Sequence, residues 1–138
     1  MDAVDGDGCS ALYVAIEEDG GDGMCELLLA AGASPDLGNA DIGRDNTLLA
    51  WAASRRRFDL VELLLKHGAD PNTPGKSGMY PLHMAARAAD KAIIEALLAQ
   101  GADPAKKWFH SGPGVTARQM AEKNPRAVAA GCLSVMPD

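Results

Sequence analysis

The sequence predicts an all-α solenoid of stacked helix–turn–helix pairs, because one short pattern recurs four times along its 138 residues. The copies begin at Ser10, Thr47, Tyr80 and Thr116, which are 37, 33 and 36 residues apart. A period in this range is typical of supersecondary units that bury their apolar faces only by stacking. Aromatic residues make up only 4% of the chain, and a composition dominated by Ala, Leu and Gly also favours closely packed helices.

The first copy predicts two short helices, over residues 11–18 and 24–31, with Ser10 as the N-cap of the first. The glycine-rich segment 19–23 forms the turn between them, since glycine is a poor helix former. Gly32 stands where a left-handed C-cap belongs. Each copy is therefore expected to be one helical hairpin.

The second and third copies follow the same plan. Thr47 is the expected N-cap of a first helix, three arginines at 55–57 fill the turn, and residues 58–67 form a leucine-rich second helix. The third copy begins at Tyr80 and is closed by Gly101. Helices of about ten residues are marginal alone in water, so each pair must gain its stability by stacking on the next.

The fourth copy is degenerate. It begins at Thr116, and Pro125 interrupts the segment that would form its turn. Residues 127–133 can supply a last short helix.

The residues at these positions are similar to the ankyrin repeat. The shared features are a Thr/Ser-x-Leu-x-x-Ala opening, a leucine-rich second helix and a closing Gly-Ala-Asp-Pro-Asn. The third copy matches best, with Pro81-Leu82-His83 in phase with Gly101-Ala102-Asp103. The resemblance covers essentially the whole chain as a single domain, with repeats at about 7–39, 44–76 and 77–109 and a partial capping repeat at 113–135.

The resemblance implies a fold and a role. Each repeat should add a hairpin-like finger at right angles to its helices, and the fingers and first helices should line a concave surface that binds another protein. Such repeats rarely carry catalysis. The resemblance also places His83 at the motif's own histidine position, where it makes hydrogen bonds at the junction of finger and helix.

Three departures from the family pattern make this chain individual. The outer fingers, at 33–46 and 102–115, are each three residues longer than the middle one. Arg56 and Ala89 stand in turns where the family favours glycine, which predicts distorted turns. Tyr80 replaces the usual capping Thr, and its ring can face either the concave side or the core.

Charge and composition exclude several classes of function. The net charge is −6, and the first 43 residues contain ten acids but no Lys or Arg, so nucleic acid is not an expected partner. This polarity either orients a protein partner or only keeps the chain soluble. No apolar run is long enough to span a membrane, and no secretory signal is evident, which predicts a cytoplasmic protein.

No cofactor, metal site or catalytic centre is predicted. The three cysteines lack C-x-x-C spacing, and the three histidines fall in different repeats. The sequence has neither a nucleophile elbow nor a phosphate-binding loop. We therefore predict a non-enzyme.

Candidate binding residues lie on first helices and finger tips. The positions after the inner alanines give an acidic-to-basic groove, and Trp108 and Phe109 are adjacent aromatics in a finger, where Trp with flanking cations is typical of interface anchors. Alternatively, one of these rings folds under the finger, and Trp51 is expected to pack between repeats. The predicted protein-binding residues are Glu17, Glu18, Asp41, Arg44, Arg55, Met79, Tyr80, Arg87, Lys107, Trp108, Phe109 and His110.

The sequence thus supports two functions. The first is a binding module, monomeric when free, that regulates another protein by occluding its working surface, as an inhibitor or immunity protein acting on an enzyme or toxin does. The alternative is a structural adaptor or self-stacking repeat protein within a larger assembly.

Overall fold

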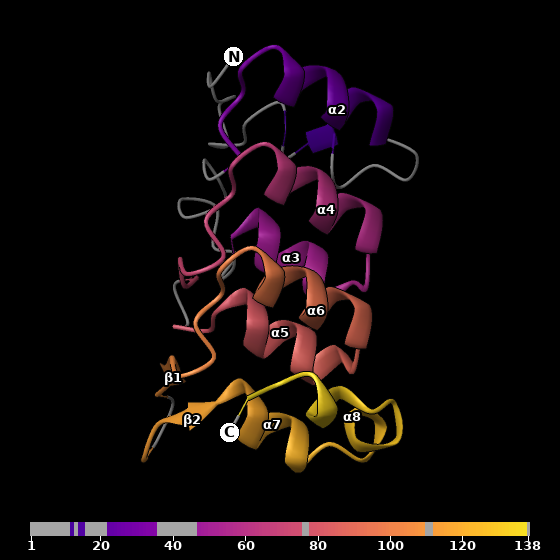
Figure 1. The fold of residues 1–138 in the computed structure, drawn as a ribbon. Helices are drawn as coiled ribbons and strands as arrows, with labels where there is room; N and C mark the ends of the chain where they lie inside the picture. Colours follow the sequence, from indigo (N-terminus) through magenta and orange to yellow (C-terminus); the bar gives the residue numbers. More distant parts are fainter. Residues whose placement is uncertain are drawn as a thin grey trace.

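The described part of the chain is built around two columns of short helices (Figure 1). The computed structural model describes residues 12, 14–15, 22–35, 47–75, 78–109 and 112–137. This architecture confirms the predicted all-α solenoid. One column contains the first helices of the repeats, α3 (Leu48–Ser54), α5 (Pro81–Ala88) and α7 (Ala117–Glu122), and the other the second helices, α2 (Asp22–Ala30), α4 (Phe58–Lys66) and α6 (Lys91–Ala99).

Threonine side chains begin two of the first helices, as expected for Thr47. Its Oγ1 accepts a hydrogen bond of 3.1 Å from the backbone N–H of Ala50. Thr116 makes a reciprocal capping box with Gln119, in which each side chain accepts from the other residue's backbone N–H. Such caps satisfy N–H groups that have no partner within the helix.

Glycines in the left-handed region end the second helices. Gly32, Gly68 and Gly101 have φ values of 100°, 92° and 92°, which glycine adopts without steric penalty. The residue after each glycine donates its backbone N–H back to the last turn of the helix. The C-cap predicted at Gly32 is confirmed.

The turns inside the second and third repeats keep a left-handed residue without glycine. Arg56 has φ 59° and Ala89 has φ 60°. Both turns close with the same bond, from the next residue's N–H to a carbonyl of the first helix, at 3.0 Å for Arg57 and 3.2 Å for Asp90. The expected distortion is therefore absent, and the chain accepts an unfavourable φ instead.

Small residues allow the helices to stack closely. Ala52 and Ala53 of α3 and Ala85 and Ala86 of α5 are completely buried, and α3 packs on α5 while α5 packs on α7. Larger apolar residues complete the core. The largest fully buried apolar side chains are Leu12, Leu48, Leu49, Leu60, Val61, Leu64, Pro81, Ile93, Ile94 and Leu97.

The C-terminal helix begins at the proline that was expected to interrupt its repeat. Pro125 occupies the first turn of α8 (Pro125–Ala129), where its missing N–H is not needed. Asn124 caps this helix through Oδ1, and its Nδ2 donates to the carbonyl oxygens of Ala86 and Arg87. The last repeat is thereby tied to the end of α5.

The segment after α8 folds back on α7. It contains the short 3-10 helix η1 (Cys132–Ser134). Arg118 of α7 donates from Nη1 to the carbonyl oxygens of Leu133 and Met136, at 3.1 and 2.7 Å. The degenerate helix expected over 127–133 is thus two short pieces, separated at Gly131, which has φ 75°.

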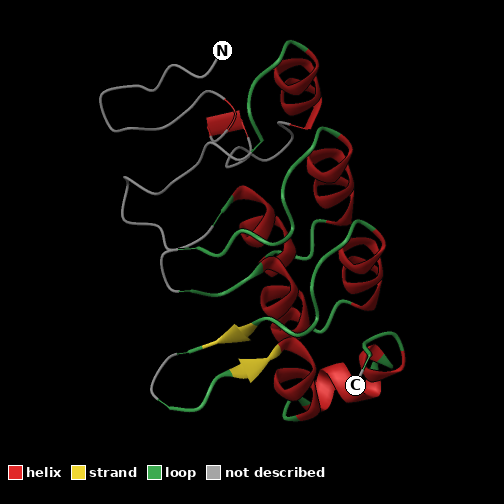
Figure 2. Cartoon of the chain, turned by 60° about the vertical axis from the view of Figure 1, so that its left-hand side comes forward, coloured by secondary structure: helices red, strands yellow, loops and turns green. Residues whose placement is uncertain are grey.

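The last finger is a β-hairpin that projects from the side of the first helices (Figure 2). Strand β1 (Lys107–Trp108) pairs antiparallel with β2 (Val115–Thr116), in the register Lys107↔Thr116 and Trp108↔Val115. The lengthened finger therefore has ordered backbone pairing on both sides of its tip.

The bases of the middle and last fingers are joined through Asn72. Its Nδ2 donates to the carbonyl oxygen of Gly101 at 2.9 Å, and its Oδ1 accepts from the backbone N–H of Asp103 at 2.7 Å. Both amide atoms are thus used between repeats, so the two fingers keep a fixed spacing.

Candidate protein-binding surface

The structure describes seven of the twelve predicted binding residues. Glu17, Glu18, Asp41, Arg44 and His110 lie outside the described residues. The acidic end predicted for the groove falls there too. Of the others, Arg55, Arg87, Lys107 and Phe109 are exposed, Tyr80 and Trp108 are half-buried, and Met79 is buried.

Met79 belongs to the core and not to the surface. Only 4% of it is exposed. Its carbonyl oxygen accepts a 3.0 Å hydrogen bond from the backbone N–H of Gly75. This bond closes the turn of the middle finger. An apolar side chain at the start of a first helix is better placed under the finger than on it, so Met79 is not presented to a partner.

A hollow lies between the C-terminal ends of α3 and α5. It has a volume of about 470 Å³ and is lined by Ser54, Arg55, Met84, Arg87 and Ala88. Both arginines are exposed, whereas Met84 is buried. The hollow therefore has an apolar floor and two guanidinium groups at its rim.

Trp51 packs between repeats, as predicted, and also positions one of these arginines. The half-buried ring lies against the core. The guanidinium carbon of Arg55 lies 5.5 Å from the centroid of the ring, within the range of a cation–π interaction. The tryptophan thus supports the surface without being fully displayed on it.

Tyr80 joins the base of the last finger to α5. It is the N-cap residue of this helix but makes no capping bond. Its ring centroid lies 5.7 Å from that of His83, and Lys106 Nζ lies 5.9 Å from the Tyr80 ring centroid. The tyrosine therefore replaces a helix cap by ring contacts.

His83 holds the last finger against α5. It is 1% exposed, and its Nε2 lies 2.8 Å from the carbonyl oxygen of Val115 in β2. Because a carbonyl only accepts, Nε2 must carry the proton. Nδ1 has no partner among the described residues. Burial lowers the pKa of the imidazole, and the bond to Val115 opposes this shift. The predicted bond at the finger–helix junction is confirmed.

The two aromatic residues of the last finger differ in exposure. Trp108 is half-buried against the core, and a Cβ placed on Gly78 would lie 3.6 Å from its Cδ1. Trp108 thus lies near Gly78 of the middle finger, whereas the alternative considered for one ring was that it folds under its own finger. Phe109 is 66% exposed, so it is the ring that this finger displays.

Gly114, the residue before β2, makes room for the Phe109 ring. A Cβ built on Gly114 would lie 2.6 Å from Phe109 Cε1 and Cζ and 2.8 Å from Lys107 Cβ. No real Cβ tolerates such contacts, so the ring lies directly across the glycine backbone. The sequence signals a loop at Gly112-Pro113-Gly114 but not this contact, and the role of Gly114 was missed.

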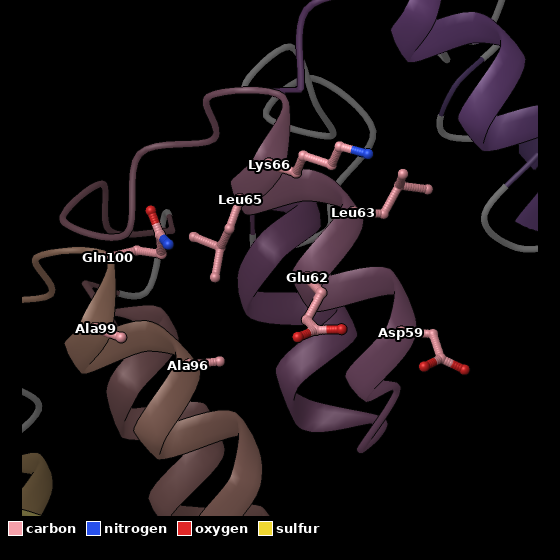
Figure 3. A pocket seen from close by; sticks show the side chains of 8 residues that line it. All are labelled: Asp59, Glu62, Leu63, Leu65, Lys66, Ala96, Ala99 and Gln100. Atoms are coloured by element: carbon pink, nitrogen blue, oxygen red, sulfur yellow. The ribbon is translucent and has the colours of Figure 1, made fainter.

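A second hollow lies on the outer column, between α4 and α6 (Figure 3). It has a volume of about 570 Å³ and is an open groove with mixed charged and apolar walls. Among the described residues no group of three His, Cys, Asp or Glu side chains could hold a metal ion. The residues lining the groove are Asp59, Glu62, Leu63, Leu65, Lys66, Ala96, Ala99 and Gln100.

The fold and its surface define a helical repeat protein that displays its distinctive side chains on a finger and on helix ends. Such a surface is typical of a protein–protein interaction module. A family model described as ankyrin repeats matches three copies over residues 12–107, and the chain belongs to this family. Ankyrin repeats mediate protein–protein interaction and are generally not catalytic.

Similar proteins come from distant organisms. An ankyrin repeat protein of fowlpox virus (strain NVSL) is 35% identical over 97 residues, which are 70% of this chain and 21% of the relative. The B-cell lymphoma 3 protein homolog of Mus musculus is 33% identical over 105 residues, or 76% and 23%. The 2-5A-dependent ribonuclease of Homo sapiens is 38% identical over 74 residues, or 53% and 10%. The chain thus spans less than a quarter of each of these relatives.

No helix in the described ranges is long and apolar enough to cross a membrane.

Proposed function

We propose that the chain binds a protein partner through its last finger and the concave face formed by its first helices, and regulates that partner by occlusion. The observation that carries this proposal is Phe109, an exposed aromatic ring that lies against the backbone of Gly114. Aromatic side chains of this kind are frequent anchors of protein interfaces.

The contact of the Phe109 ring with Gly114 would lower the entropic cost of binding. An exposed side chain normally loses rotamer freedom when it becomes an interface contact, at roughly 0.5–1.5 kcal/mol. Because Phe109 already lies against Gly114, the residue before β2, part of that entropic cost is met on folding. Hairpin pairing and the His83–Val115 bond fix the finger itself.

Occlusion is the mechanism that suits a rigid stack with a displayed finger. The exposed groups lie on a projecting hairpin and on helix ends, so a bound partner would have its own surface covered. An enzyme or toxin inhibited in this way is one version of the proposal. Monomeric state when free, the single capped domain and the cytoplasmic location remain predictions from the sequence.

The proposal is tested by affinity purification with the full chain. Phe109→Ala removes the displayed ring, whereas Val128→Ala removes an exposed apolar side chain on α8 as a matched control. A partner retained by the wild type and the control but lost from Phe109→Ala supports the proposal, and its activity is then assayed with and without the chain. Undiminished recovery by Phe109→Ala would overturn it.

A specific observation favours the second candidate, a repeat protein that stacks within a larger assembly. Met24 and Leu27 of α2 are 55% and 66% exposed. Counted from the closing glycines, Met24 corresponds to Leu60 in α4, which is 2% exposed because α2 covers that helix. No described helix covers the equivalent face of α2, and a further helix pair stacked there would bury Met24 and Leu27.

Light scattering after gel filtration separates the two candidates. Self-stacking predicts a mass that grows with concentration and falls on Leu27→Glu. A constant monomer mass in both variants would contradict self-stacking and leave the binding module as the function.

A further inference from the structure

We infer that the partner docks through an acidic segment, one carboxylate of which lies between Arg55 and Arg87 in the hollow at the ends of α3 and α5. This inference rests on the proposed function, since it names the chemistry of the partner that the concave face receives. It concerns a different part of the surface from Phe109.

The hollow has the shape and chemistry for a carboxylate on an apolar stem. Arg55 and Arg87 stand at its rim, and the buried Met84 forms part of its floor. The Ser54 hydroxyl already donates to the carbonyl oxygen of Trp51 at 2.7 Å. The two guanidinium groups are therefore the strong donors that an incoming group would meet, and guanidinium matches carboxylate geometry.

These two arginines are unpaired in the part of the chain that the structure describes. Other arginines have acidic partners: Arg56 Nε lies 3.4 Å from Asp90 Oδ2, and Arg118 Nε lies 3.2 Å from Glu122 Oε1. Neither Arg55 nor Arg87 forms an ion pair with an acid of the described ranges. Among the described residues, no acid neutralises their positive charge.

Arg55 is also held in position for this role. Its guanidinium lies over the Trp51 ring, and Trp51 packs against the core. A stacked guanidinium loses less freedom when it binds an anion than one that moves freely in solvent. The ring therefore prepares one side of the hollow.

The helix ends oppose an anion but do not cancel the two cations. A helix C-terminus carries about half a negative charge. At the end of α5, the carbonyl oxygens of Ala86 and Arg87 already accept hydrogen bonds from Asn124 Nδ2. Two full positive charges thus face two partial negative ones, and the balance favours an anion.

The charges of the second and third repeats are arranged to suit an acidic partner on this face. α3 and α5 contain no acid, whereas the exposed acids Asp59, Glu62 and Glu95 lie on α4 and α6. Lys106 lies over Tyr80 at the other end of α5. The eight residues of α5 span about 12 Å. About four residues of an extended peptide cover this length.

A phosphate backbone would also find two arginines attractive, but a protein segment suits this chain better. The net charge is −6, which at long range repels a polyanion more strongly than a segment with a few carboxylates. A short acidic peptide needs only the local cations and gains apolar contact with Met84. We therefore commit to an acidic protein segment, and nucleic acid becomes an arm of the test.

The test is an NMR titration of the isotope-labelled full chain with three probes. These are the blocked peptide Gly-Glu-Glu-Phe-Glu-Glu-Gly, the same peptide with Gln in place of Glu, and the single strand (dT)10. The Glu peptide should shift the Nε–H signals of Arg55 and Arg87 and the amides of residues 54–55 and 87–88. The Gln peptide should not.

Two charge-matched variants complete the design. Arg55→Gln/Arg87→Gln should weaken binding of the Glu peptide by about tenfold or more, whereas Lys66→Gln/Lys91→Gln, which removes two exposed charges from α4 and α6, should leave it within about twofold. Equal losses in both variants, equal binding of the Gln peptide, or tighter binding of (dT)10 would overturn the inference. If the arginine variant fails to weaken binding but Phe109→Ala still loses the partner, the inference is wrong and the proposed function stands.

Discussion

His83 Nε2 donates a 2.8 Å hydrogen bond to the carbonyl oxygen of Val115, across 32 positions of the chain. One buried side chain thereby connects a first helix, α5, to the outer strand of the last finger. The ring has no further partner at Nδ1 within the described residues. The finger that displays Phe109 is therefore fixed to the stack by a group that can titrate.

The first prediction is that stability falls in mild acid. Burial lowers the pKa of His83 below its ordinary value of 6.5, so the unfolded chain takes up this proton at a higher pH than the folded chain does. The stability that comes from keeping His83 neutral is therefore fully present above pH 6.5. It is lost as the pH falls toward the pKa of His83 in the folded chain. Urea unfolding between pH 7.5 and 5 measures this slope.

The control for this prediction is His83→Gln, whose Nε2 keeps a donor for Val115 without a titrating ring. The variant should lose part of the acid-dependent slope, while the contribution of all other groups stays common to both proteins. An unchanged slope in His83→Gln would show that His83 does not cause the acid sensitivity.

The second prediction concerns the missing cap at Tyr80. Thr47 and Thr116 stand at the same place in their repeats and accept from Ala50 and Gln119, whereas Tyr80 makes no such bond. Tyr80→Thr should therefore be more stable than Tyr80→Ala by about 1 kcal/mol, because both lose the ring but only Thr gains a cap. Thermal and urea unfolding of the two variants measure the difference.

The hydroxyl of the Tyr80→Thr variant also tests the buried imidazole of His83. If it donates to the bare Nδ1 of His83, the gain over Tyr80→Ala should exceed that of an ordinary cap, since an unsatisfied buried group costs about 1–3 kcal/mol. Equal stability of the Thr and Ala variants would contradict both effects.

The third prediction is that glycine stabilises the turn at Arg56. This residue has φ 59°, a region that costs a non-glycine residue about 1–2 kcal/mol. Its ion pair with Asp90 is largely exposed on the arginine side, where such pairs contribute little. Arg56→Gly should raise the free energy of unfolding by about 1 kcal/mol, as measured in urea.

Ala89 provides the matched comparison, with φ 60°. Its side chain is buried, so Ala89→Gly relieves the same backbone strain but loses a buried methyl group, worth about 0.8 kcal/mol. It should gain less than Arg56→Gly. A larger gain at Ala89 would mean that backbone strain does not control these turns.

Local patterns were sufficient to predict the repeats. The N-cap at Thr47 and the C-cap at Gly32 depend on a few neighbouring residues and on the repeat spacing, and both are present. Pro125 was expected in the turn before a helix at 127–133, but it begins α8, because a proline in a turn and one in the first turn of a helix look alike without the cap. Asn124 supplies that cap, through contacts that also reach α5.

The surface was harder to predict, because it depends on residues distant in the sequence. Trp108 and Phe109 are adjacent, yet one packs near Gly78 while the other is displayed across Gly114. Met79 was predicted at the surface because it flanks a finger, but the stack buries it. Periodicity assigns a face to residues in helices and gives no such assignment in loops.

The last prediction concerns Gly114. A methyl group there would lie 2.6 Å from the Phe109 ring and 2.8 Å from Lys107 Cβ, so Gly114→Ala must displace the ring or open the hairpin. We expect Gly114→Ala to lose about as much partner binding as Phe109→Ala does. The free energy of unfolding should fall only slightly, because the displaced ring is already exposed. Binding is measured on the partner recovered with the wild type, and stability by urea unfolding.

Gly112→Ala is the matched control on the same finger, since a Cβ at Gly112 meets nothing within 4 Å. It makes the same chemical change and reduces loop freedom in the same way, so it should bind as the wild type does. If Gly112→Ala lost as much binding as Gly114→Ala, the effect would come from the flexibility of the finger and not from the position of the ring. If neither variant lost binding, the held ring would not be the anchor of the interface.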